Sequence, residues 1–445
     1  MGCSPTRPGP VDVAGLEPPD PRETGESAAG GKGPGDHGRV GRPSEAAQAG
    51  GILRGNEDTR QANFLELFFD LALVFALIGV VSRVVPDLLS ENVRLRWLSL
   101  LYTVVLALPL LWLWTTTAHI TSRFDFRNRW IQLLVLASAF GLLIMTTSLP
   151  YAFVARGGAF AVPYVLLHIG RPLLLRTMLR EHGAIRALYT RRAIWSTASA
   201  VFWLWGAAER DAYRVALWSV AITVDLVVAR FSWPVPGMRR VPTSAWAMAD
   251  TAHLPGRYQQ LLLIALGETV LSIGLTYTAH PATIAATTAL VITFLSSVLL
   301  WRIYFYRAGQ VLAQAVGMSS NRATLGRNIG SAHVLMVLGI VAIAAGAEIV
   351  LAHPGGRTQP AWLLAILGGP AIFMLGRIRL ERAVFNRLAV RRFVAIGALV
   401  LLAPPLAFGP PLLAAIVAAV VLLGVAVADA RHAAGRPLEV PSPSA

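Results

Sequence analysis

Five carboxylates lie inside long apolar runs of this sequence, where a charge is costly. They are Glu66, Asp70, Asp225, Glu268 and Glu348. A charged side chain at the centre of a bilayer costs about 2.5–3.5 kcal/mol on insertion scales, so it faces the protein interior, a water-filled cavity or a basic partner. The chemistry that such groups support in a membrane is the binding of a proton or a cation. These carboxylates are therefore the first candidates for function.

The first pair of carboxylates forms a stripe on one helix face. Asn63, Glu66 and Asp70 follow one another at spacings of three and four, so they share a face. Exposure of that face to lipid would leave Asp70 unpaired in hydrocarbon, so we expect the face to point into the bundle. The stripe is read either as a proton or cation site or as a structural partner for an arginine of a neighbouring helix.

Glu268 is the strongest single candidate. It lies about nine residues into its apolar run, next to Gly267, which lets another helix approach closely. We expect Asp70 to be its partner across the two halves of the chain, with one of the two carboxylates holding a proton. The alternative is a buried structural pair, for which the sequence offers Arg123, Arg171 and His168.

Other signatures of chemistry are absent from the sequence. His168 and Arg171 are three residues apart and would share a face, whereas His119, His253 and His333 do not have the spacing of metal ligands. There is no phosphate loop, nucleophile elbow or zinc signature. No catalytic residue is assigned, and neither a metal nor a cofactor is expected.

The composition predicts how these residues are positioned. Of 445 residues, 55% are hydrophobic and 14% are charged, and the mean hydropathy is +0.57. An ordinary soluble domain is about a quarter charged, so the chain is expected to be an all-α polytopic membrane protein. The net charge of +15 comes from arginines between apolar runs, which are topology signals rather than a nucleic-acid groove.

The chain divides into a tail and a membrane domain. Residues 1–60 contain 13 Gly and 8 Pro, a composition that cannot bury a core, so they are expected to be a disordered tail. Residues 61–430 form the transmembrane domain, and 431–445 form a short second tail. We expect about twelve transmembrane helices, at 64–82, 97–118, 131–150, 158–176, 194–208, 212–229, 259–277, 283–301, 331–352, 361–376, 393–408 and 411–428.

The arginines predict the orientation. With the N-terminus placed in the cytoplasm, the cytoplasmic segments after residue 60 carry 25 arginines and the outer segments carry 7. This asymmetry is the positive-inside pattern of an inner-membrane protein with both termini in the cytoplasm. An even helix count permits a 6+6 repeat, in which two halves of six helices have the same orientation.

Several blocks of residues resemble the bacterial low temperature requirement A family. The stretch 63–71 resembles the opening E-L-F-F-D-L block of that family, and 253–269 resembles its H-x-x-E-R-F/Y…I-A-L-G-E-S block. Supporting blocks are found at 114–125, 300–305 and 331–348. The resemblance extends over roughly residues 60–430.

The chain departs from the family pattern at three positions. Ser122 stands where the family has Asn, Gly256 where it has Glu, and Thr269 where it has Ser. The missing acidic residue before Arg257 weakens a pairing proposal for that arginine. The resemblance implies a multi-pass inner-membrane protein connected with growth in the cold, and it implies no biochemical activity.

Three functions remain open at this point. The preferred one is a proton- or cation-coupled transporter, because deep carboxylates lie on glycine-containing helices. The second is a membrane enzyme acting on lipid or isoprenoid substrates, for which Asp70, Arg123 and His168 would have to converge. The third is an accessory membrane protein for cold growth. The expected partners are the lipid bilayer and an unknown small molecule or ion, without nucleic acid.

Overall fold

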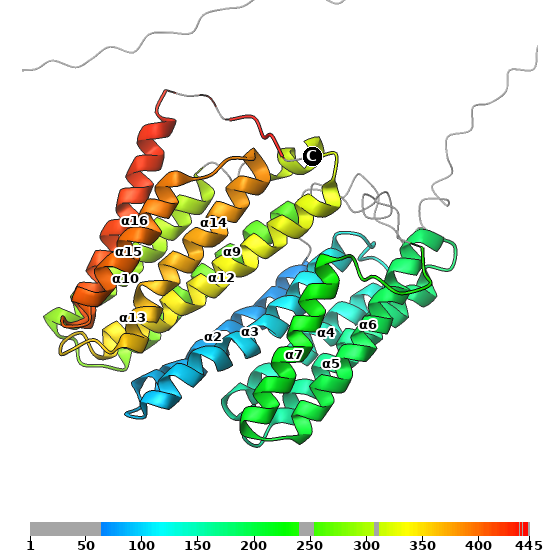
Figure 1. The fold of residues 1–445 in the computed structure, drawn as a ribbon, viewed down its shortest axis with the longest axis horizontal. Coiled ribbons are helices and arrows are strands. Elements are labelled where there is room, and N and C mark those ends of the chain that lie inside the picture. The colour runs from blue at the N-terminus through cyan, green and yellow to red at the C-terminus, as the bar shows by residue number, and fades with distance from the viewer. Residues whose placement is uncertain (1–63, 240–252, 307–310, 436, 438, 444–445) are drawn as a thin grey trace, which may run out of the picture. The chain divides into compact units, whose positions relative to one another are not determined.

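The computed structural model describes residues 64–239, 253–306, 311–435, 437 and 439–443. Within these ranges it contains helices and no strand (Figure 1). The fold is therefore all-α, as the composition predicts. The expected disordered tail at 1–60 and Asn63 lie outside the described residues.

The helices fall into two sets along the chain. The first set is α2 (Phe64–Leu89), α3 (Val93–Thr121), α4 (Arg129–Ser148), η2 (Leu149–Tyr151), α5 (Gly157–Met178), α6 (Gly183–Ala208) and α7 (Asp211–Arg230). The second set is α9 (His253–Thr278), α10 (Ile284–Phe305), α11 (Leu312–Met318), α12 (Arg322–Ala352), α13 (Pro360–Ile366), α14 (Gly368–Phe385), α15 (Val390–Leu406) and α16 (Pro411–Ala433). Every predicted span coincides with a helix, and the tenth coincides with α13 and α14, which meet at Leu367.

Length and composition support ten of the about twelve expected membrane spans among the described residues, with α13 and α14 counted as one. The two helices that fall short are α6 and α15. Arg186, Arg191 and Arg192 lie in the first three turns of α6, and α15 has only 17 residues with Pro404 and Pro405 near its end. Both are nevertheless formed, and α6 packs along α5 and α7 while α15 packs along α14 and α16.

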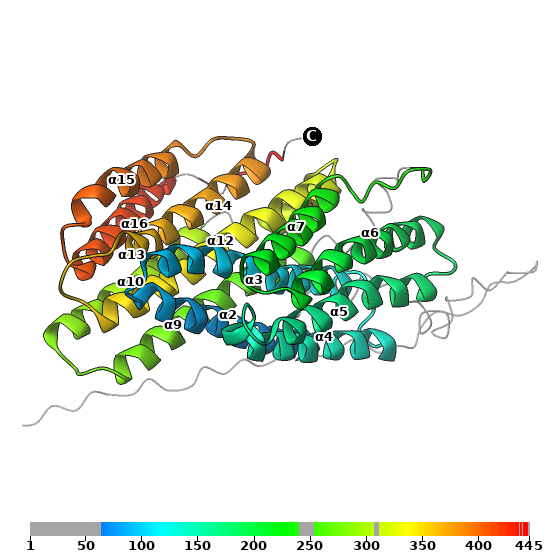
Figure 2. The same cartoon turned by 60° about the horizontal axis from the view of Figure 1, so that its bottom comes forward.

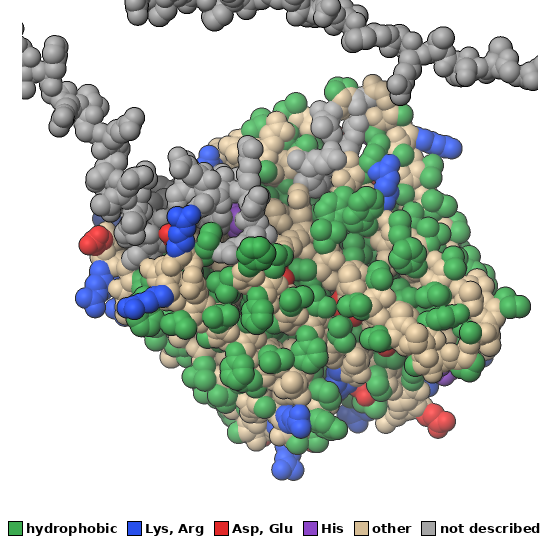
Figure 3. All heavy atoms as spheres, turned by 180° about the vertical axis from the view of Figure 1, so that it is seen from behind, with side chains coloured by type: hydrophobic (Ala, Val, Ile, Leu, Met, Phe, Trp, Pro, Cys, Tyr) green, Lys and Arg blue, Asp and Glu red, His purple; other side chains and the backbone are tan. Residues whose placement is uncertain are grey.

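The outer surface of the helices is apolar. Exposed large side chains include Phe140 of α4, Leu166 of α5, Val201 of α6, Phe294 of α10 and Leu401 of α15. Figure 3 shows hydrophobic side chains spread over the face that it displays. Soluble monomers rarely expose apolar patches of this extent, so the surface is that of a membrane protein.

The two sets of helices pack by the same scheme, which agrees with the 6+6 division. Figures 1 and 2 agree that α14–α16 lie on one side and α4–α6 on the other, with α2, α3, α9 and α12 between them. The packed pairs of the first half are α2–α3, α2–α4, α3–α4, α3–α7, α4–α5, α5–α6 and α6–α7. Their counterparts are α9–α10, α9–α12, α10–α12, α10–α16, α12–α14, α14–α15 and α15–α16.

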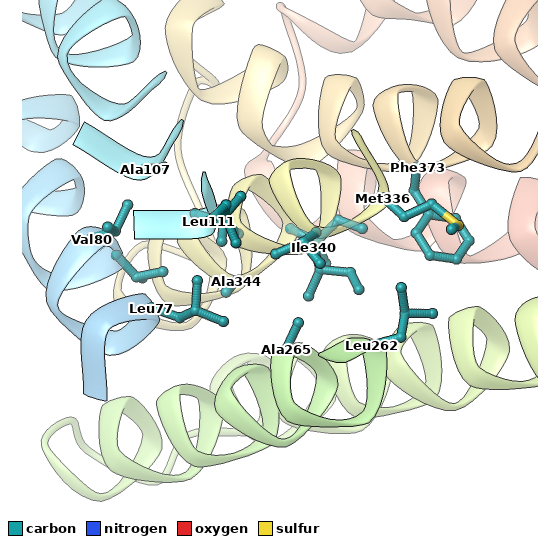
Figure 4. Close-up of a cluster of buried hydrophobic side chains, with 14 of the residues drawn as sticks. Leu77, Val80, Ala107, Leu111, Leu262, Ala265, Met336, Ile340, Ala344 and Phe373 are labelled. Carbon is teal, nitrogen blue, oxygen red and sulfur yellow. The ribbon is translucent and has the colours of Figure 1, made fainter. Parts of the chain in front are cut away.

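The halves meet where α2 and α3 pack against α9 and α12. Figure 4 shows Leu77 of α2, Leu111 of α3, Ala265 of α9 and Ile340 of α12 gathered in this core. On its other side α12 approaches α14 closely, because a Cβ on Gly339 would lie 2.6 Å from the backbone nitrogen of Phe373. Three of these junction helices carry carboxylates of the sequence analysis: Glu66 and Asp70 lie on α2, Glu268 on α9 and Glu348 on α12.

Candidate functional site

Asp70 is fully engaged at the junction between the halves. Nη1 of Arg257 donates to its Oδ2 at 2.9 Å, and Nη2 of Arg257 donates to its Oδ1 at 3.0 Å. The indole nitrogen of Trp114 donates to Oδ1 at 2.8 Å. A bidentate arginine with a third donor is a strong way to hold a buried carboxylate. This contact therefore links α2 of the first half to α9 of the second.

Glu66 belongs to the same group of charges. It lies one helical turn before Asp70, and both residues are buried, so the predicted face points into the bundle as far as it is described. His253 Nε2 is 3.3 Å from Glu66 Oε2, and Arg257 Nε is 3.8 Å from Oε1. We call Glu66, Asp70, His253 and Arg257 the junction charge cluster.

An aromatic and histidine network continues from the junction charge cluster toward α10. Tyr258 stacks on the ring of His333 with centroids 4.8 Å apart. His333 Nδ1 is 2.8 Å from the carbonyl oxygen of Ile329, so Nδ1 carries a proton, and His333 Nε2 is 2.7 Å from the hydroxyl oxygen of Tyr304. Both ring nitrogens of His333 are thus engaged within the protein, which indicates a structural role.

Glu268 lies in a different environment farther along α9. Its side chain is 0% exposed. The hydroxyls beside it are those of Thr269 and Ser272, and the charged group that acts on it electrostatically is Glu348 of α12. The Ser272 hydroxyl in turn donates to the Glu348 carboxylate. In the part of the chain that the structure describes, no arginine or histidine compensates Glu268.

Asp70 is not the partner that we expected for Glu268. Arg257 holds Asp70, and Arg257 precedes Glu268 by eleven residues of the same helix, about 16 Å at 1.5 Å per residue. The carboxylate that accompanies Glu268 is Glu348 instead. Glu348 lies four residues before the end of α12 and is half-buried against Ser272.

The basic residues proposed as partners of Glu268 have other neighbours. His168 Nε2 is 3.1 Å from Oδ1 of Asp225 on α7. Arg171 donates to the hydroxyls of Thr117 at 2.9 Å and Thr116 at 2.8 Å on α3. His168 and Arg171 do line one small cavity together. Arg123 is buried just after the end of α3.

The residues that the sequence analysis missed are Arg257 and His253. Both open α9, within the block that resembles the family's H-x-x-E-R-F/Y block. That block was the available signal, but the absence of an acidic residue at Gly256 directed attention away from Arg257. Its acidic partner comes from another helix. Among the described residues, no group of three or more His, Cys, Asp or Glu could hold a metal ion.

Comparisons with known proteins agree with this picture of a membrane bundle. The family model described as bacterial low temperature requirement A protein matches residues 61–427. An uncharacterized protein of Rhizobium meliloti (strain 1021) is 32% identical over 333 residues, which are 74% of this chain and 80% of that relative. No solved structure matches.

Proposed function

Because this chain belongs to the bacterial low temperature requirement A family and its described residues include ten helices long and apolar enough to cross a membrane, we propose that it is a proton- or cation-coupled transporter of the inner membrane. The observation that carries the proposal is the complete burial of Glu268 without a basic partner in the described part of the chain. An intramembrane carboxylate of this kind must hold a proton or a cation, or else remain charged at high cost.

The contrast with Asp70 supports this assignment. Asp70 has a bidentate arginine and an indole donor, so its charge is compensated within the protein. Glu268 has only hydroxyls and a second carboxylate, Glu348, around it. Two neighbouring carboxylates repel when both are ionised, which favours a proton on one of them.

The surroundings of Glu268 provide a route to the predicted outer side. Ser272 is one helical turn beyond Glu268 and donates to Glu348. Glu348 is four residues before the end of α12, about 6 Å along the helix axis. In the described part of the chain the Glu268 carboxylate makes no hydrogen bond to Ser272, so proton transfer from Glu348 would require the Ser272 hydroxyl to turn toward Glu268.

The packing scheme supports a transport cycle. Transporters built from parallel repeats work by rocking one half against the other around a site near the bilayer midplane. Here the halves meet through α2 and α3 against α9 and α12. The junction charge cluster crosses that boundary and would latch the halves at the predicted cytoplasmic end, while Glu268 lies deeper in the bundle.

The structure does not bring together the residues that the enzyme alternative requires. It required Asp70, Arg123 and His168 to converge, but Asp70 is bound by Arg257 and His168 is bound by Asp225. The other alternative is an accessory role in the membrane. A transport assay has to distinguish this role from transport.

Transport is tested with the purified full-length protein in proteoliposomes that enclose a pH-sensitive dye. A panel of small solutes is added outside while an imposed pH gradient is followed. We expect at least one solute to change the rate of proton movement relative to protein-free vesicles, and an imposed gradient to drive its uptake. Proton movement equal to that of empty vesicles for every solute would favour the accessory role.

A further inference from the structure

A cavity of about 690 Å³ lies where α10, α14 and α16 end and α15 begins. The 25-to-7 arginine asymmetry places these helix ends at the cytoplasmic side. The helices contribute three positive side chains to the cavity wall, Arg377, Arg391 and Arg392. They contribute two negative side chains, Glu381 and Asp429. Arg387, in the loop between α14 and α15, adds a positive charge, and Glu439, which lies 2.6 Å from Arg387 and also lines the cavity, adds a negative one.

The carboxylates of the cavity wall are already engaged. Arg392 contacts Glu381 at 2.8 Å and Asp429 at 3.0 Å. Arg391 lies 3.7 Å from Asp429. Both acidic side chains are thus bound chiefly by a single arginine, which leaves a positive surplus on the remaining wall.

The positive charge that remains on the cavity wall is that of Arg377, which is buried. Its side chain is 2% exposed, and its Nη2 is 3.7 Å from Glu381, beyond hydrogen-bond distance. Its Nε and Nη1 have no hydrogen-bond partner among the described residues. A guanidinium keeps its charge and has five donors in a planar fork, which suits the oxygens of a phosphate. Arg377 therefore lines the cavity with a buried guanidinium, two nitrogens of which have no hydrogen-bond partner among the described residues and whose Cζ lies 5.8 Å from the Tyr304 ring centroid.

The edge of the cavity is apolar. Leu388 and Val390 line it and are 60% and 67% exposed. They flank the start of α15, whose outer face is apolar as well. An arginine-rich pocket between membrane helices, with apolar side chains at its mouth, matches the head group and first carbons of an anionic lipid.

The corresponding place in the first half is closed. Its cavity of about 30 Å³, room for about one water molecule, is lined by Arg171 of α5 and Arg192 of α6. These arginines occupy the helices that correspond to α14 and α15. Trp233 covers Arg192 at 4.3 Å, and Arg171 is satisfied by threonine hydroxyls. The cavity at this place in the first half is thus much smaller, although Arg192 Nε there also has no hydrogen-bond partner among the described residues.

We propose that the cavity at the ends of α14, α15 and α16 binds a phosphate-bearing anion, with Arg377 as its central ligand. The anionic phospholipid head group and a free phosphate share this chemistry, and the apolar rim favours the lipid. The segment after α16 competes for the site, because Glu439 contacts Arg387 at 2.6 Å and Ser442 bonds to the carbonyl oxygens of Val384 and Phe385.

The test is the thermal unfolding of the full-length protein in a neutral detergent, titrated with short-chain phosphatidylglycerol, short-chain phosphatidylcholine or inorganic phosphate. A ligand that binds the folded state raises the midpoint as its concentration rises. We expect phosphatidylglycerol to do so and phosphatidylcholine not to. If inorganic phosphate gives the same rise and phosphatidylglycerol adds nothing to it, the anion is a free phosphate. No rise with either anion would overturn the proposal.

Variants assign the binding to the cavity. We expect Arg377→Gln to weaken phosphatidylglycerol binding about tenfold and Arg387→Gln to weaken it about threefold, while Glu439→Gln strengthens it by removing the competing carboxylate. Arg431→Gln is the matched control, because Arg431 is exposed on α16 and does not line the cavity. If Arg377→Gln does not fold, the proposal is tested by the other two variants. Arg387→Gln should weaken phosphatidylglycerol binding, and Glu439→Gln should strengthen it. Unchanged binding in all variants would contradict the site.

Discussion

Glu268→Gln should abolish gradient-driven uptake in proteoliposomes while leaving the bundle folded. Glutamine keeps the size and hydrogen-bonding capacity of a protonated Glu but cannot release a proton. Because no basic group depends on Glu268 in the described part of the chain, the substitution strands no charge. We therefore expect the midpoint of thermal unfolding to stay the same or rise, with uptake at the level of empty vesicles.

The matched control for this experiment is Glu91→Gln. Glu91 lies exposed between α2 and α3, so both uptake and unfolding should stay at the wild-type level. A structural ion pair at Glu268 predicts the opposite pattern. In that case the stranded partner would cost about 3–5 kcal/mol and lower the amount of folded protein. A well-folded Glu268→Gln protein with full uptake would reject both the coupling role and the structural pair.

Asp70→Asn should cause the largest loss of stability among single carboxylate substitutions. It removes the bidentate partner of Arg257, which is 2% exposed, and leaves that guanidinium with the more distant Glu66 carboxylate at 3.8 Å. Removal of one partner from a buried ion pair costs about 3–5 kcal/mol. The measurement is the free energy of unfolding in mixed micelles, or the thermal midpoint where unfolding is irreversible.

A double substitution separates the ion pair from other effects of Asp70. Asp70→Asn with Arg257→Gln removes both charges and should recover much of the lost stability. The comparison pair is Asp87→Asn, since Asp87 pairs with Arg83 within one helix at a less buried position. That substitution should cost about 1 kcal/mol or less. If Asp70→Asn were no more harmful than Asp87→Asn, the junction charge cluster would not hold the halves together.

The helices were predictable because hydrocarbon leaves few structural choices. Each apolar run had to satisfy its own backbone hydrogen bonds, so every predicted span is a helix. The residues at which the helices begin and end were less predictable. The predicted span 194–208 belongs to a helix that begins at Gly183, since polar turns rich in arginine extend a helix without adding hydropathy. The same turns explain why α6 fails as a span by composition while remaining part of the bundle.

The burial of Glu66 and Asp70 was predictable from their spacing, but their partners were not. Arg257 is 187 residues from Asp70 in the chain, and only the packing of α2 on α9 brings them together. Asp225 of α7 likewise has its partner on another helix, because His168 belongs to α5. The Arg377 cavity was missed for a related reason. Arginines between apolar runs were interpreted as topology signals. Nothing in the sequence showed that Arg377 and Arg392 are buried in the wall of a cavity.

The central claim is that Glu268 holds an exchangeable proton within the membrane. Infrared spectroscopy measures this directly, because the carbonyl stretch of a protonated carboxylic acid differs from that of a carboxylate and shifts in heavy water. The account predicts a protonated-acid band at neutral pH that is absent from Glu268→Gln, is displaced in Glu348→Gln and persists in Glu91→Gln. An identical band pattern in the wild-type and Glu268→Gln proteins at neutral pH would contradict it.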